Sequence, residues 1–257
     1  MIKAVLFDFG GTLHTSISTE AIALQAAEGV QRILSGNGII LNDPPDIFAE
    51  KLAVGHKAYK KYCEISKREL PPYTIWSEWF LKEYDFDREA LYGLAEKLAN
   101  YYVLNHVKYT MLPDIPETLK ELKRRGIRLG IISNIISRTV VQTTVKDYGI
   151  ADYFEYIMTS AECGHRKPDP MIFDLALDEM GLRPSECAYV GDTVSRDVIG
   201  TRNSGIRYMI KIRNEAKAKK DAEFKDSGYT HDYLIGSPYE IVGIVDEINF
   251  NDEGGDK

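Results

Sequence analysis

Asp8 is a candidate catalytic residue because of the residues that follow it. It is followed by Gly10-Gly11 and, four residues after it, by Thr12. A carboxylate beside the flexible backbone amides of a glycine turn is a candidate nucleophile with a cradle for an oxyanion or a phosphate group. The same pattern also forms ordinary tight turns between a strand and a helix, so Asp8 alone does not identify a site.

Three other short clusters contain side chains of catalytic or metal-binding type. They are Ser133-Asn134, Lys167 in the loop Gly164–Pro170, and the pair Asp192 and Asp197 behind Gly191. Ser and Asn at the end of a strand usually cap the next helix, and a lysine in a proline-framed loop is usually exposed. Two carboxylates five residues apart either hold a divalent cation or cap a helix. Each cluster taken alone is therefore compatible with a structural role.

Apolar runs typical of buried parallel strands precede three of the clusters. These runs are Ala4–Phe7, Arg128–Ile132 and Cys187–Val190. Strands that are buried on both faces of a sheet have continuous rather than alternating hydrophobic residues. The carboxyl ends of the strands in an open parallel sheet share one edge, where ligands bind. We therefore expect the polar clusters to converge at that edge.

Helical patterns alternate with these strands. Helices are expected at Pro116–Arg125, Thr139–Tyr148 and Pro170–Met180, each followed by a glycine. Further strands are expected at Tyr156–Thr159, Arg207–Ile210 and Tyr233–Ile235, and a capping box at Ser237–Glu240 opens a last helix that runs to about Ile248. The alternation predicts the α/β class with a doubly wound, Rossmann-like parallel sheet.

Residues 16–109 interrupt the alternation with helical patterns only. Helices are expected at Thr19–Leu34, Pro45–Glu69, Tyr73–Tyr84 and Arg88–Asn105. They predict an all-helical domain, residues 16–109, inserted into an α/β core of residues 1–15 and 110–250, with a disordered polar tail over 251–257. Aromatic residues at helical spacing more often pack a small domain's core than line a pocket. The inserted domain contains Tyr59, Tyr62, Tyr73, Trp76, Trp79, Phe80 and Tyr84.

The composition restricts the class of protein further. Of the 257 residues, 44% are hydrophobic and 28% charged, which is typical of a folded globular chain. The net charge of −7 disfavours nucleic acid as a partner, and the charged segment Lys211–Lys225 is interpreted as a solvated helix or loop. Three scattered cysteines, no membrane-length apolar run and no signal peptide predict a cytoplasmic protein without a membrane partner. The substrate and the oligomeric state are not predicted.

Taken together, in this order and strand context, the clusters resemble the four motifs of the haloacid dehalogenase superfamily. The resemblance covers roughly residues 1–15 and 110–248, and in that family the helical region between the first two motifs is a mobile cap over the site. The matching segments are Asp8-Phe9-Gly10-Gly11-Thr12, Ile131-Ile132-Ser133-Asn134, Lys167–Phe173, and Tyr189-Val190-Gly191-Asp192 with Asp197, Gly200 and Gly205.

The resemblance implies a role for each motif residue. Asp8 would attack phosphorus to form an aspartyl-phosphate, and Ser133 and Lys167 would bind the transferring group. Thr12 and Asn134 would also bind the phosphate. Mg²⁺ is implied as cofactor, with the Asp8 carboxylate, the backbone carbonyl of Gly10 and Asp192 as its ligands and Asp197 in support. A carboxylate attacks a phosphate dianion only where cations offset the repulsion, and hard oxygen ligands suit magnesium.

Gly10 departs from the family's phosphatases, which have Asp-x-Asp-x-Thr in the first motif. The missing carboxylate would protonate the leaving alcohol, and losing such a group typically costs about 10²–10⁴-fold in rate. The main expectation is a phosphatase for small phosphorylated metabolites that is slow, limited to good leaving groups, or assisted by another acid such as His14. A second hypothesis is acid-independent chemistry such as phosphonate cleavage, with a Schiff-base lysine among Lys51, Lys57, Lys60 and Lys61, or dehalogenation. The third is a pseudoenzyme that binds a phosphorylated ligand or a partner protein, and the fourth is an unrelated α/β binding protein.

Overall fold

A six-stranded parallel sheet forms the centre of the molecule. The computed structural model describes the backbone of residues 1–254 and the side chains of residues 1–252. The sheet has the order β5-β4-β1-β6-β7-β8, and every neighbouring pair is parallel. Its strands are β1 (Ala4–Phe7), β4 (Arg128–Ser133), β5 (Tyr156–Thr159), β6 (Cys187–Gly191), β7 (Tyr208–Ile212) and β8 (Tyr233–Ile235).

The predicted α/β class with a doubly wound sheet is confirmed. Strand β1 lies between β4 and β6, so the chain fills one half of the sheet before it crosses to the other half. In such sheets ligands bind where the strand order reverses, at the carboxyl ends of the strands. That point in this molecule lies at the ends of β4, β1 and β6, which carry Ser133, Asp8 and Asp192.

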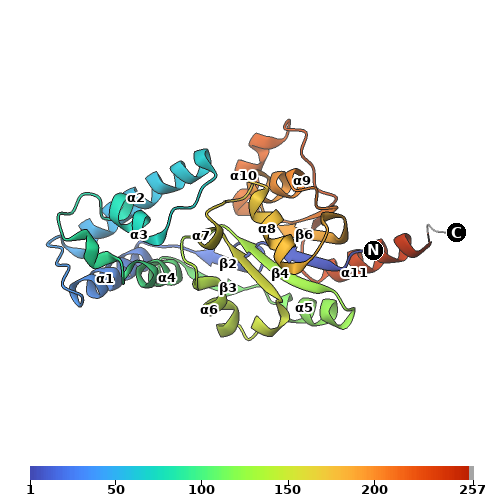
Figure 1. Cartoon of the computed structure of the whole chain (residues 1–257), viewed down its shortest axis with the longest axis horizontal. Coiled ribbons are helices and arrows are strands. Elements are labelled where there is room, and N and C mark those ends of the chain that lie inside the picture. The colour runs from blue at the N-terminus through green and yellow to red at the C-terminus, as the bar shows by residue number, and fades with distance from the viewer. Residues whose placement is uncertain (255–257) are drawn as a thin grey trace.

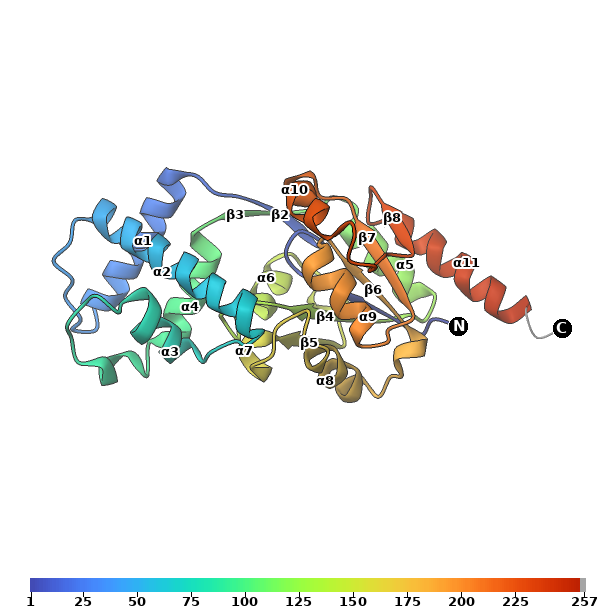
Figure 2. The same cartoon turned by 90° about the horizontal axis from the view of Figure 1, so that it is seen from above.

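Helices cover both faces of the sheet (Figures 1 and 2). Side chains alternate along each strand, so that Val5 and Phe7 of β1 enter one apolar cluster and Ala4 and Leu6 enter another. The first cluster includes residues from α5 (Ile115–Arg124), α6 (Val140–Asp147) and α11 (Glu240–Gly254), and the second includes residues from α8 (Met171–Met180). The shorter elements of this part are 3-10 turns at Ala151–Tyr153, Pro184–Glu186, Glu215–Lys217 and Ala222–Phe224, a π-helical turn at Val194–Val198, α7 (Ser160–Cys163), α9 (Ile199–Asn203) and α10 (Ala218–Asp221).

The remaining helices form a group at one end of the molecule, on the left of Figure 1, which we call the helical insertion (residues 18–107). It contains α1 (Glu20–Ser35), α2 (Pro45–Ser66), α3 (Pro72–Ile75), a π-helical turn at Trp76–Phe80, a 3-10 turn at Arg88–Leu91 and α4 (Ala95–Asn105). The long helix expected over Tyr73–Tyr84 is thus replaced by a short α-helix and a π turn, and the one expected over Arg88–Asn105 begins as a 3-10 turn. Tyr59, Trp76 and Phe80 are buried among the helices, as aromatic residues that pack a core would be.

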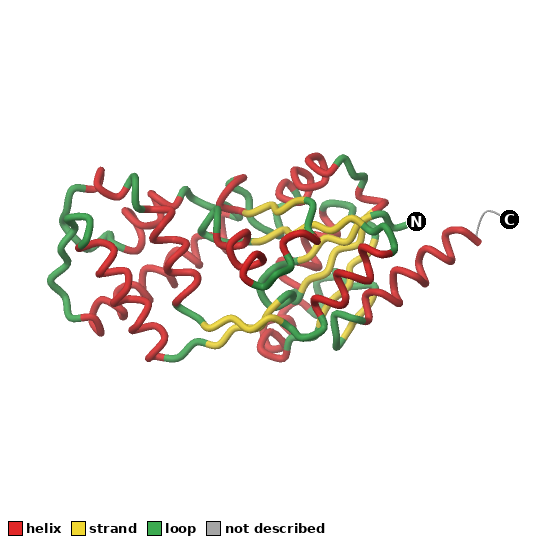
Figure 3. Tube along the Cα trace, turned by 90° about the horizontal axis from the view of Figure 1, so that it is seen from below, coloured by secondary structure: helices red, strands yellow, loops and turns green. Residues whose placement is uncertain are grey.

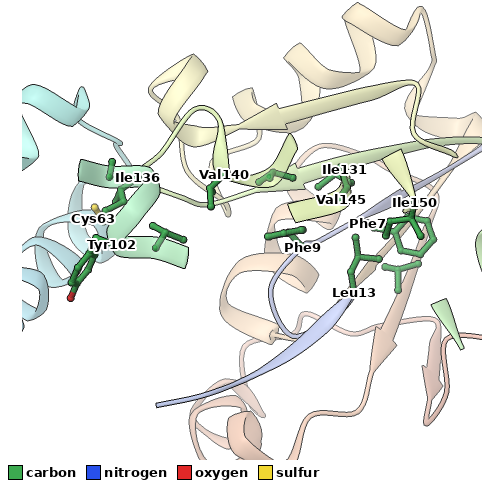
Figure 4. Close-up of a cluster of buried hydrophobic side chains, with 14 of the residues drawn as sticks. Phe7, Phe9, Leu13, Cys63, Tyr102, Ile131, Ile136, Val140, Val145 and Ile150 are labelled. Atoms are coloured by element: carbon green, nitrogen blue, oxygen red, sulfur yellow. The ribbon is translucent and has the colours of Figure 1, made fainter. Parts of the chain in front are cut away.

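An antiparallel ribbon joins the helical insertion to the rest of the chain (Figure 3). Strand β2 (His14–Ile17) pairs with β3 (Lys108–Met111), so both passages of the chain run side by side. Neither strand is evident in the sequence, because three of the four β2 residues are exposed and its partner lies more than 90 residues away. The apolar core is continuous past this ribbon: Figure 4 shows Tyr102 and Cys63 of the insertion in the same cluster as Phe9, Ile131 and Val140.

The carboxyl-terminal segment differs from the expected disordered tail over 251–257. Helix α11 begins at Glu240, whose side chain accepts hydrogen bonds from the backbone amides of Gly236 and Ser237, and it continues to Gly254. Asp252 pairs with Arg207 at 2.8 Å and with the amino terminus at 2.5 Å. These charge pairs extend the helix past Ile248, and residues 255–257 lie outside the described residues.

Candidate active site

The ends of the central strands surround a cavity of about 450 Å³. Asp8, Gly10, Ser133, Asn134 and Asp192 line it, so five of the eight predicted site residues face one space. Lys167 lies beside them and lines an adjoining cleft together with Asn134. Thr12 and Asp197 are buried and do not line either space. The strand ends therefore bring together the side chains that the sequence separates by up to 189 residues, between Asp8 and Asp197.

Lys167 is the centre of the polar network. Its Nζ donates to Oδ1 of Asp8 at 2.6 Å, to Oδ1 of Asp197 at 2.8 Å and to the Tyr189 hydroxyl at 2.7 Å. All three of its hydrogens are thus used, and its side chain is 1% exposed. A lysine buried to this extent is stable when opposite charges neutralise it. The exposure that is usual for a lysine in a proline-framed loop therefore does not apply to Lys167, which lies with Asp8 as the combined motifs predict.

Asn134 and Asp197 hold Lys167 in place. The Asn134 side chain accepts a hydrogen bond from the Lys167 backbone amide at 2.8 Å and donates to the Lys167 carbonyl at 2.9 Å. Asp197 accepts from the Thr193 amide and hydroxyl as well as from Lys167. Burial would raise the pKa of Asp197, but Lys167, nearby positive charge and these hydrogen bonds outweigh it and lower the pKa. In this geometry Asn134 contacts the lysine loop, whereas the resemblance implies contact with phosphate.

The pKa values of the Asp8 and Asp192 carboxyl groups are both raised, because their surroundings disfavour the ionised form. Burial raises the pKa of Asp8 in spite of Lys167, and burial together with the charges of Asp8 and Asp197 raises the pKa of Asp192 to about 7. One oxygen of Asp192 accepts from Asn214 at 2.7 Å, while its other oxygen is buried without a hydrogen-bond partner in the described part of the chain. Oxygen atoms of Asp8, Asp192 and Asp197 lie within 4.8 Å of one another. Such a donor set, with a buried oxygen that accepts no hydrogen bond and lies 3.7 Å from Nη2 of Arg196, fits a hard divalent cation.

The two glycines of the first motif serve different purposes. Gly11 has φ +87°, and a β-carbon there would lie 2.1 Å from Oδ2 of Asp192, so only glycine allows this approach. A β-carbon at Gly10 would meet no atom within 4 Å, and Gly10 does not have a positive φ. The backbone therefore accepts a side chain at position 10.

His14 is a poor replacement for the missing acid at position 10. Its ring lies on β2, edge-on to Phe9 and 4.5 Å from the ring centre of Tyr109, and its Nδ1 is 3.4 Å from the Tyr148 hydroxyl. Burial lowers the pKa of His14 to about 4. At neutral pH the ring is uncharged and has no readily lost proton.

The helical insertion supplies the opposite wall of the cavity. His56 of α2, Tyr102 of α4 and His106, which follows the end of α4, line it. Nδ1 of His56 lies 3.1 Å from the Tyr102 hydroxyl, and the ring of Tyr102 stacks on His106. The sequence analysis did not identify these residues, because no local pattern distinguishes a cavity-facing histidine from a packed one.

Arg166, Arg196, Asn214 and Lys217 also line the cavity and were not predicted. The sequence contained a clue for two of these residues. Arg196 stands between Asp192 and Asp197, and Asn214 follows the end of β7, where a residue would lie at the same edge of the sheet. Nη2 of Arg196 lies 3.7 Å from Asp192. Arg166 pairs with the buried carboxylate of Glu69, which also accepts a hydrogen bond from Ser160 at 2.6 Å. This ion pair connects the segment after α2 to the loop that carries Lys167.

Comparison with known proteins places the fold and site in a family. The family described as haloacid dehalogenase-like hydrolase matches residues 2–205. A glyceraldehyde 3-phosphate phosphatase of Methanopyrus kandleri is 27% identical over 96% of this chain and 99% of its own length. A phosphoserine phosphatase of Thermus thermophilus is 33% identical over 60% of this chain and 64% of its own.

A solved structure shows the same fold. The 2-haloacid dehalogenase of Pseudomonas syringae superposes with a TM-score of 0.64 over 96% of this chain and 100% of its own, at 22% identity. The protein belongs to the haloacid dehalogenase-like hydrolase family. The expected family and the hydrolase class are thereby confirmed. None of the helices described here is both long and apolar enough to pass through a membrane.

Proposed function

We propose that the protein is a phosphatase that removes the phosphate group from a small phosphorylated metabolite with the help of Mg²⁺. The observation that carries the proposal is the position of Lys167, which donates to Asp8 at 2.6 Å beside the partly unpaired Asp192. This arrangement keeps a carboxylate and a cation together at the wall of a cavity. Relatives named as phosphatases that align over most of the chain support it.

Asp8 is the proposed nucleophile. Its carboxylate oxygen forms a bond to phosphorus while the bond to the leaving oxygen breaks, which gives an aspartyl-phosphate that water then hydrolyses. Lys167 holds Asp8 by a hydrogen bond and offsets negative charge on the transferring group. The Ser133 hydroxyl, at the end of β4 in the cavity wall, is placed to donate to a phosphate oxygen. Thr12 is the further proposed phosphate ligand: its hydroxyl oxygen has no hydrogen-bond partner among the described residues, but it is buried behind the residues that line the cavity.

Asp8, the carbonyl of Gly10 and Asp192 are the proposed Mg²⁺ ligands, and Asp197 and Asn134 position Lys167. The ion would supply positive charge that reduces repulsion between Asp8 and the phosphate. Residues 1–15 and 110–250 would then act as the catalytic core and residues 16–109 as a cap. A cytoplasmic location is proposed on the three free cysteines, which a reducing compartment would maintain.

Gly10 determines which substrates are expected. Without a carboxylic acid at position 10, the leaving oxygen receives no proton from this wall, and neutral His14 does not replace it. Good leaving groups, such as those of acyl and aryl phosphates, need little protonation. We therefore expect faster turnover of these than of alkyl phosphates.

A panel of acyl, aryl and alkyl phosphates with added Mg²⁺ tests the proposal. Asp8→Asn should lower kcat/KM by at least about 10³-fold on each active substrate, because the nucleophile is lost while the shape is kept. Asp169→Asn is a matched control, since this carboxylate lies two residues after Lys167 and pairs with His165 outside the cavity. Equal rates for the wild type and Asp8→Asn, or no turnover of any substrate, would overturn the proposal in favour of a binding protein.

A further inference from the structure

A second cleft, of about 470 Å³, adjoins the catalytic cavity and is lined by seven positively charged residues. Asn134, Arg166, Arg196 and Lys217 line both spaces, so the two adjoin. Glu64 is the carboxylate residue on its wall within the described part of the chain. The positively charged residues on the wall are Lys60, Lys67, Arg166, Lys167, Arg196, Lys217 and Lys220.

Most of these cations have a negative partner. Lys220 pairs with Glu64 at 2.7 Å, and Arg166 pairs with Glu69. Lys60, Lys67 and Lys217 form no ion pair with any residue of the part that the structure describes, although Lys67 donates a hydrogen bond to the Glu64 backbone carbonyl. In a chain with a net charge of −7, these three lysines make the cleft a local excess of positive charge.

The lysines come from different parts of the molecule. Lys60 lies on α2 in the helical insertion, and Lys217 lies in the 3-10 turn Glu215–Lys217 after β7. Burial lowers the pKa of Lys60, although Glu64 acts against this. The positive charges of Lys217, Lys220 and Arg196 lower it further, which shows that the cations are close enough to repel one another. An anion between them would relieve that repulsion.

We propose that Lys60 and Lys217 bind a second anionic group of the substrate, so that the substrate class is a phosphate monoester that also carries a phosphate or a carboxylate. This inference rests on the proposed phosphatase function, which places the scissile phosphate next to Asp8. The cleft is large enough for a substituent of several atoms. The anion would also bridge α2 and the turn after β7, and so would bring the helical insertion and the sheet together around the substrate.

Binding to the Asp8→Asn protein tests the inference separately from turnover. The probes are 3-hydroxypropyl phosphate, 3-(phosphonooxy)propanoate and propane-1,3-diol bisphosphate, which share a three-carbon chain and differ in the second group. Calorimetry with Mg²⁺ should show that a second anion increases affinity by about 10-fold to 100-fold, the usual range for charged hydrogen bonds. A preference for the bisphosphate alone assigns a phosphate, and a preference for both probes with a second anionic group assigns any anion.

Exchange of both lysines should remove this preference. Lys60→Met with Lys217→Met should bind all three probes with similar affinity while binding 3-hydroxypropyl phosphate as before. Lys219→Met is the matched control, because this lysine lies in the same segment but does not line the cleft. Equal affinity for the three probes, no binding of either probe with a second anionic group, or a preference that survives the double substitution would overturn the inference. If the probes with two anionic groups bind preferentially but the wild type hydrolyses no phosphate, the proposed function fails and the second binding site stands.

Discussion

The two walls of the cavity at the strand ends both contain ionisable side chains, but the charge states of these side chains differ. On the sheet wall, Lys167, Asp8 and Asp197 keep opposite charges at hydrogen-bond distance. On the helix wall, His56 lies against the Tyr102 hydroxyl, and burial, with a smaller contribution from neighbouring cations, lowers its pKa to about 4. The sheet wall thus holds charged side chains in pairs of opposite sign, whereas the helix wall presents neutral side chains that form hydrogen bonds.

The largest expected effect concerns the helix wall at low pH. His56 binds a proton near pH 6.5 in the unfolded chain but only near pH 4 in the folded one. The unfolded chain therefore gains protons first, and His56 reduces the free energy of unfolding as pH falls from 6.5 to 4. The difference of about 2.5 pKa units amounts to about 3 kcal/mol.

Urea unfolding of the wild type and of His56→Gln at pH 7.5 and pH 4 measures this effect. The variant should lose about 3 kcal/mol less than the wild type between the two pH values. Asp192, whose raised pKa acts in the opposite direction, contributes equally to both proteins and cancels. Tyr102→Phe serves as control because it removes the hydroxyl that contacts His56 but keeps the titrating ring. The same pH dependence in His56→Gln and the wild type would mean that the histidine is not buried in neutral form.

The second effect concerns Mg²⁺ binding at the sheet wall. Asp192→Asn should weaken Mg²⁺ binding by more than the 10-fold to 100-fold that is typical for loss of a group supporting a metal ligand. Without Mg²⁺ the variant should be at least as stable as the wild type, since repulsion from Asp8 and Asp197 disappears. Calorimetric titration and thermal unfolding give both quantities. Unchanged affinity would exclude Asp192 as a ligand.

Introducing an aspartate at position 10 tests whether a general acid is the one catalytic group that the sheet wall lacks. Gly10→Asp has room for its β-carbon, so it should raise kcat/KM on alkyl phosphates by about 10²-fold and change that on acyl phosphates much less. The contrast between leaving groups is measured on both proteins, with Gly10→Asn as the control of equal shape. A uniform gain would indicate better folding or metal binding instead. No gain, with unchanged melting temperature and Mg²⁺ affinity, would favour acid-independent chemistry or a non-catalytic role.

The residues of the sheet wall could be predicted from the sequence, and those of the helix wall could not. Buried parallel strands have continuous apolar runs, so Ala4–Phe7 and Tyr156–Thr159 are predicted with the bounds that the structure has. The side chains after those runs must converge, whatever their distance along the chain. His56 and Tyr102 meet only through the packing of α2 and α4, and β2 exists only because β3 pairs with it. Such contacts leave no local pattern.

The central position of β1 has a consequence for how the chain reaches this structure. Ala4–Phe7 is fully buried and pairs with Arg128 to Ile131 and with Cys187 to Val190. These partners follow it by more than 120 and 180 residues, and at roughly 5–20 residues per second the ribosome needs on the order of 10 to 30 s to supply them. Contacts this distant in sequence form slowly, whereas the helices of residues 18–107 contact one another across fewer than 90 residues. Strand β1 is therefore synthesised first but is among the last strands to be buried. Until then its apolar side chains are exposed and available for chaperones to bind.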